Sequence, residues 1–105
     1  MRQIEKDMNN AVKNKIAWSK SNTCTTFSSD LKECFIYLHG NHIATVTTNT
    51  VQLFDGGYQS NTTKSRLNAI LDEFNYGARV FQKHWEWYFQ GNNEPAIDFT
   101  SGMII

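Results

Sequence analysis

The sequence predicts an α+β protein, with an antiparallel sheet of four to six strands, an N-terminal helix and a second helix packed on the sheet. Two stretches support this prediction. Residues 63–74 repeat apolar side chains at helical spacing, and residues 80–89 are an aromatic run typical of a strand. The Asn-Tyr-Gly segment at residues 75–77 ends this helix and turns the chain back into the strand, so the helix is expected to lie on the sheet.

Length and composition indicate one folded domain over residues 1–105. The hydrophobic fraction of 40% and the aromatic fraction of 13% exceed those of a disordered chain. Ten basic residues balance ten acidic ones, so no overall charge favours nucleic acid or a membrane. No apolar run approaches about 18 residues, and the charged N-terminus does not resemble a signal peptide. We therefore expect a cytoplasmic protein without membrane contact.

The N-terminal segment, residues 1–20, is predicted to be mainly helix, ending at Trp18. Its apolar stripe is thin and drifts around the helix, so we expect the helix to dock weakly or to serve a partner. The apolar residues that form this candidate interface are Ile4, Met8, Val12 and Trp18.

The core of the fold is predicted over residues 23–90. A Thr-rich edge strand covers 23–28, and a hairpin with a Gly40-Asn41 loop joins the strands on either side. This loop would pair Leu38 with Ile43 and leave Val46 on the face opposite Leu38. Both faces of the hairpin are then partly apolar, which predicts a helix on each. A further strand at 50–54 follows.

Two features near the C-terminus have alternative interpretations. The aromatic run reads as one strand, or as two strands with a tight turn at Lys83-His84. The tail, residues 91–105, ends in an apolar stretch that adds a strand, covers the core or forms a homodimer. Its last residues are candidate interface residues: Met103, Ile104 and Ile105.

The second helix has its charges reversed with respect to its dipole. Lys64 and Arg66 lie in the first turn and Asp72 and Glu73 in the last, at a cost of about 0.3–1 kcal/mol for each exposed charge. One interpretation is a bound anion. The residues that would hold it are Thr62, Thr63, Lys64 and Arg66. The alternative is that these charges pair with residues elsewhere in the fold.

The aromatic run also has two interpretations. If it is a single strand, Trp85 and Trp87 share one face, and the rings form a stacking platform for nucleic acid beside Arg79 and Lys83. Alternatively, this face is the core under the second helix. We favour the core, because so small a domain needs these rings to bury enough apolar surface.

Metal binding and catalysis have little support. The residues Cys24, Cys34, His39 and His42 match no compact zinc motif. The hairpin also places Cys34 on the face opposite both histidines. No nucleophile elbow or paired carboxylates are present, so we expect no enzyme, no cofactor and no metal.

Several motifs resemble a group of uncharacterised proteins from tailed-phage genomes. They are residues 39–44, 57–71 and 80–83 with Trp87-Tyr88, so the likeness covers roughly residues 22–90. The resemblance implies a phage-encoded protein acting in the bacterial cytoplasm, and it implies no residue roles. Our leading hypothesis is a non-enzymatic binding protein that modulates or inhibits a host or phage complex. The alternative is a nucleic-acid-binding protein, and an enzyme acting on a phosphorylated small molecule ranks below both.

Overall fold

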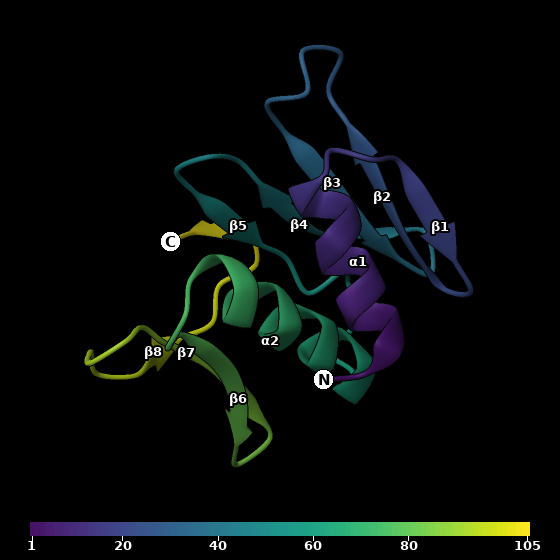
Figure 1. Ribbon diagram of the computed structural model, residues 1–105. Coiled ribbons are helices and arrows are strands. Elements are labelled where there is room, and N and C mark those ends of the chain that lie inside the picture. Colours follow the sequence, from purple (N-terminus) through teal and green to yellow (C-terminus); the bar gives the residue numbers. More distant parts are fainter.

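Two antiparallel sheets and two helices make up the fold in the computed structural model, which describes residues 1–105 (Figure 1). The larger sheet has the strand order β1-β2-β3-β4-β5-β9 and the smaller has the order β6-β7-β8. The helices are α1 (Gln3–Lys13) and α2 (Asn61–Phe74). The strands are β1 (Trp18–Lys20), β2 (Thr23–Phe27), β3 (Cys34–Leu38), β4 (Asn41–Val46), β5 (Val51–Leu53), β6 (Arg79–Lys83), β7 (Glu86–Gln90), β8 (Ile97–Asp98) and β9 (Met103–Ile104). The predicted α+β class with a sheet of up to six strands is confirmed, whereas the separate small sheet was not predicted.

Helix α1 is shorter and more deeply packed than predicted. It ends at Lys13, because Asn14 leaves the helical region and Lys15 has a positive φ of 54°. The chain then forms β1, which pairs with β2, so the prediction that β2 is an edge strand was wrong. The side chain of Met8 is fully buried and Val12 is 7% exposed, so weak docking of this helix was also wrong.

The β3–β4 hairpin turns one residue earlier than predicted. His39 and Gly40 have φ values of 52° and 77°, the positive pair that a tight two-residue turn requires. Leu38 therefore pairs with Asn41, not with Ile43, which has no partner and forms a bulge. Beyond the bulge, Val46 pairs with Cys34 and is buried in the core, so its predicted place on the opposite face was wrong.

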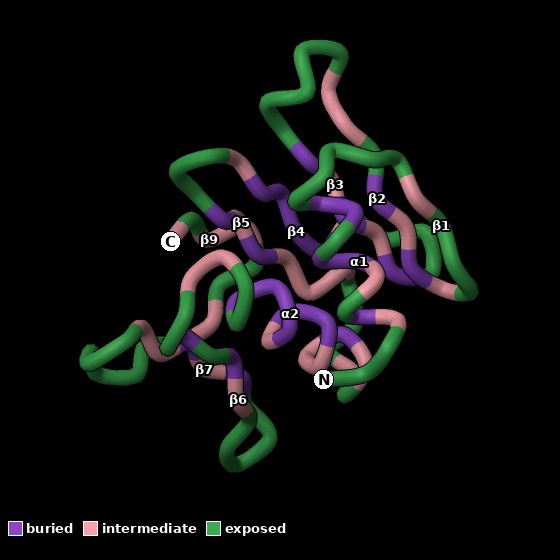
Figure 2. Tube along the Cα trace, in the orientation of Figure 1, coloured by how far each residue is buried: buried purple, intermediate pink, exposed green.

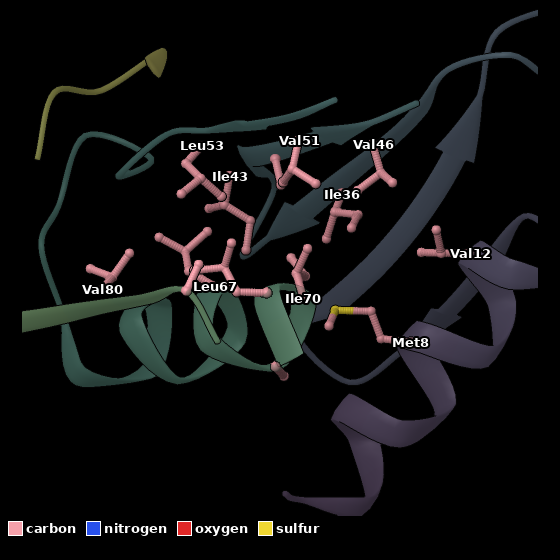
Figure 3. Packing of buried hydrophobic residues seen from close by; sticks show 14 of the residues in the cluster. Met8, Val12, Ile36, Ile43, Val46, Val51, Leu53, Leu67, Ile70 and Val80 are labelled. Atoms are coloured by element: carbon pink, nitrogen blue, oxygen red, sulfur yellow. The ribbon is translucent and has the colours of Figure 1, made fainter. Parts of the chain in front are cut away.

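Both helices cover the same face of the larger sheet, so the predicted helix on each face was wrong (Figures 1 and 3). On the uncovered face, His42 lies among half-buried rings, with centroid distances of 5.9 Å to Phe35, 5.4 Å to Tyr37 and 4.5 Å to Phe54. These rings shield one another from water in place of a covering helix.

One hydrophobic core joins the two helices, the larger sheet and the inner face of the smaller sheet. Figure 3 shows Leu67 and Ile70 of α2 facing Ile36 and Ile43 of the sheet, with Met8 of α1 beside them. Buried residues concentrate in these elements, while the loops at the ends of the sheets are exposed (Figure 2).

The aromatic run folds as two strands, as in the second of the two predicted alternatives, but its turn lies one residue later, at His84-Trp85. Asn68 of α2 holds the first of these strands: its side chain accepts a hydrogen bond from the Val80 amide (2.8 Å) and donates one to the Val80 carbonyl (2.9 Å). The tail adds a strand to each sheet, β8 on β7 and β9 on β5.

Candidate functional site

The side chain of Arg66 lies inside the protein and does not face an external anion. It is 3% exposed, and its guanidinium donates to Glu5 of α1 (2.9 Å), to Thr23 Oγ1 (3.0 Å) and to Asn22 Oδ1 (3.2 Å). Burial alone would raise the pKa of Glu5, but hydrogen bonds from Ser65, the Arg2 amide and Arg66, together with the charge of Arg66, lower it. The stabilisation from the ionised carboxylate is therefore present at neutral pH and is lost as pH falls through the lowered pKa.

The other residues of the predicted anion site do not converge on a ligand. Ser60 caps α2, accepting a hydrogen bond from the Thr63 amide at 3.1 Å, and Thr63 itself is buried. Thr62 is half-buried, and Lys64 donates to Gln82 of β6 (3.2 Å). Of the four reversed charges, Arg66 and Glu73 pair with opposite charges elsewhere in the fold, as in the alternative interpretation, whereas Lys64 bonds to a neutral amide and Asp72 forms no ion pair.

At the other end of α2, Glu73 forms an ion pair with Lys13 of α1 at 3.1 Å. Together with the Glu5–Arg66 pair, it joins the two helices near both ends of their contact.

The turn at His84-Trp85 breaks the predicted alternation of the aromatic residues. Trp87 is 4% exposed in the core, whereas Trp85 is 91% exposed in the turn. The prediction that both tryptophans share a strand face was therefore wrong, and the core interpretation holds for Trp87.

The outer face of the β6–β7 hairpin carries a different set of aromatic and basic residues. Phe81 stacks on Tyr88 with a centroid distance of 5.6 Å, and the guanidinium of Arg79 lies 4.5 Å from the Phe81 ring centroid. A shallow depression of about 350 Å³ opens between them and the turn. It is lined by Phe81, Lys83, His84, Tyr88 and Ala96.

This outer face is mixed in charge and not basic. Glu86 lies opposite Lys83 in the strand register of the hairpin, and Asp98 of β8 lies opposite Tyr88. Burial, followed by these two carboxylates, raises the pKa of the Tyr88 hydroxyl. Arg66 is internal, and acidic residues lie among the remaining cations. The cations predicted to bind an anion or nucleic acid therefore do not form one basic patch; they are Lys64, Arg66, Arg79 and Lys83.

The hairpin tip, residues 83–86, has an unusual conformation for its sequence. His84 and Trp85 have φ values of 53° and 69°. A non-glycine residue in this left-handed helical region of the backbone costs about 1–2 kcal/mol. Two-residue hairpin turns with two positive φ values favour the pair Asn-Gly. The chain thus places a large aromatic ring in solvent at a strained position. Sequence reasoning missed this, because His-Trp is not a turn signal.

The predicted interface residues at the two ends of the chain are mostly covered. Ile4 is half-buried and Trp18 packs against the core, as do Met103 and Ile105. Met8 and Val12 lie within the core, so they do not form the exposed helix face that was predicted as an interface. Ile104 remains exposed, at 64%.

The cysteines and histidines do not come together. Cys34 faces the core, where burial raises its thiol pKa to about 12, while Cys24 lies on the uncovered face of the sheet. His39 lies in the turn and His42 among the rings. No group of three or more metal-binding side chains is arranged around a common point.

A model of the family described as Kyanoviridae Gp96 protein matches residues 1–105. The chain belongs to this phage protein family. The match confirms the resemblance to tailed-phage proteins and extends it to both ends of the chain, including α1 and the C-terminal strand. No curated protein and no solved structure matches the chain. Neither helix of this family member is long and apolar enough to cross a membrane.

Proposed function

We propose that this phage protein is a non-enzymatic binding protein that attaches to a host or phage macromolecular complex in the bacterial cytoplasm and modulates its activity. The proposed contact is the hairpin tip, with Trp85 as its central residue. The observation that supports this is the 91% exposure of Trp85 at a position where φ is 69°. Strained positions are retained where function requires them, and tryptophan is enriched among residues that dominate binding energy.

The surroundings of Trp85 fit a protein partner. Tyr88 and Phe81 continue the aromatic surface along the outer face of the hairpin, and Lys83 and Glu86 at its tip carry opposite charges. An aromatic centre with a charged rim is typical of protein interfaces. The hairpin projects from the rest of the molecule, so a partner can reach the tip without disturbing the core (Figures 1 and 2).

Replacing Trp85 with alanine should prevent the protein from retaining its partner. Tagged wild-type protein and the Trp85→Ala variant, produced during infection, are compared by quantitative mass spectrometry of the proteins they retain. We expect a specific partner to bind the variant about 30-fold or more weakly, as for a dominant interface residue. The matched control is Tyr76→Ala, which removes an 82% exposed ring outside the hairpin. Equal recovery of the same proteins by wild type and Trp85→Ala would refute the proposal.

A nucleic-acid-binding function is the second candidate. The observation that favours it is the outer face of the hairpin, where Arg79, Phe81 and Tyr88 present stacked rings beside a cation. The carboxylates of Glu86 and Asp98 on the same face oppose it. Salt-sensitive quenching of Trp85 fluorescence by single-stranded oligonucleotides, lost on Arg79→Glu/Lys83→Glu, would favour this candidate over a protein partner.

A further inference from the structure

The C-terminal end of α1 and the loop after β2 lie at the end of the molecule opposite the β6–β7 hairpin tip (Figure 1). An apolar pocket there is lined by residues from the C-terminal ends of α1 and α2, from β3 and from the loops after β2 and β4. Its volume is about 220 Å³. The apolar side chains that line it are Val12, Phe27, Leu31, Cys34, Val46 and Phe74. The first and last of these come from the two helices, so the pocket depends on the whole fold.

The mouth of the pocket is positively charged. Lys15 and Lys32 line it and are exposed, and neither forms an ion pair, since the three ion pairs of the protein join other residues. Three carboxylates lie on neighbouring segments, and none of them lines the pocket. Asp30 accepts a hydrogen bond from the Lys32 amide at 3.0 Å, Glu73 pairs with Lys13, and Glu33 is exposed beside Lys32 without forming an ion pair. The two ammonium groups at the mouth are therefore available to external anions.

The backbone holds this mouth in a costly conformation. Lys15 and Leu31, which both line the pocket, have φ values of 54° and 61°. Each such residue costs about 1–2 kcal/mol. The side chain of Leu31 is 47% exposed, so burial in the core does not explain its position.

The volume of the pocket indicates which kind of ligand it can hold. Sites for free small molecules usually measure about 300–1,000 Å³, which is larger than this pocket. A cavity of about 150 Å³ holds one benzene ring, so a single phenylalanine or leucine side chain fits. We propose that the pocket binds a segment of a partner protein in which a bulky apolar side chain is flanked by carboxylates. The ring or branched chain fills the pocket, and the carboxylates pair with Lys15 and Lys32.

An amide-resolved NMR titration tests this proposal with the blocked peptide Ac-Asp-Glu-Phe-Asp-Glu-NH2. We expect saturable shifts at Leu31, Cys34 and Val46. Binding should weaken about tenfold or more when the central Phe is replaced by Ala, or when the acidic residues are replaced by Lys. The Lys15→Glu/Lys32→Glu variant should lose binding, because carboxylates replace the two cations that attract the acidic peptide. Both side chains are exposed, so the substitutions leave the core intact. The matched control with the same charge change is Arg2→Glu/Lys6→Glu, at exposed positions at the start of α1, away from the pocket and from the hairpin tip.

Three results would overturn the proposal. The first is binding that is unchanged in Lys15→Glu/Lys32→Glu. The second is tighter binding of free 4-phenylbutyrate than of the peptide, which would indicate a small carboxylate as ligand. The third is self-association in light scattering that this double variant abolishes, which would indicate a second copy of the chain. The Trp85→Ala variant should bind the peptide like wild type, so this pocket and the hairpin tip are tested separately.

Discussion

Replacing Arg66 with alanine is expected to lower the free energy of unfolding by about 3–5 kcal/mol. The substitution leaves the carboxylate of Glu5, itself 2% exposed, without its cation, and it removes the hydrogen bonds to Thr23 and Asn22. Since domains of this kind have a total stability of about 5–15 kcal/mol, the loss is a large share of it. Urea denaturation followed by far-ultraviolet circular dichroism measures the difference.

The control for this prediction is Lys64→Ala, two residues away on the same helix. Lys64 makes one exposed hydrogen bond to Gln82, so a change within about 0.5 kcal/mol is expected. A loss below about 1 kcal/mol for Arg66→Ala would show that the charge is not buried as described.

Deleting residues 1–14 is expected to abolish cooperative folding. The deletion removes Met8 and Val12 from the core, and each buried side chain of this size contributes about 1.5–3 kcal/mol. It also removes Glu5, leaving Arg66 buried without a carboxylate, at a further cost of about 3–5 kcal/mol. Together these losses approach the full stability of a small domain. Thermal unfolding followed by circular dichroism should show no sharp transition.

A suitable comparison is deletion of Met1 alone, an exposed residue before the helix. If the shorter chain lacking residues 1–14 still melts cooperatively within a few degrees of the full-length protein, helix α1 is an accessory segment, as its thin apolar stripe first indicated.

The elements that could be predicted are those with a strong local pattern. The apolar stripe of α2 is local, and its residues Leu67, Ile70 and Leu71 are all buried. The register of the β3–β4 hairpin was not predictable in the same way. It depends on the turn at His39-Gly40 and on the bulge at Ile43, which is buried by contacts with distant segments of the chain.

In the candidate site too, features with a local sequence pattern could be predicted, and features that depend on distant contacts could not. The reversed charges of α2 were a local signal, but the partner of Arg66 lies 61 residues earlier in the chain, at Glu5. The exposure of Trp85 depends on the turn, which carries no Asn-Gly signal and forms because the flanking strands pair. Aromatic content alone could not separate the buried Trp87 from the exposed Trp85.

In the proposed function, the ring of Trp85 is retained for binding at a cost in stability. The double variant His84→Asn/Trp85→Gly tests this, because it gives the turn the residues that its backbone favours. Urea denaturation should show a free energy of unfolding higher by about 1–2 kcal/mol. The same preparation should no longer retain the partner that wild type recovers from infected cells. A variant that is less stable than wild type, or that retains the partner fully, would contradict this account.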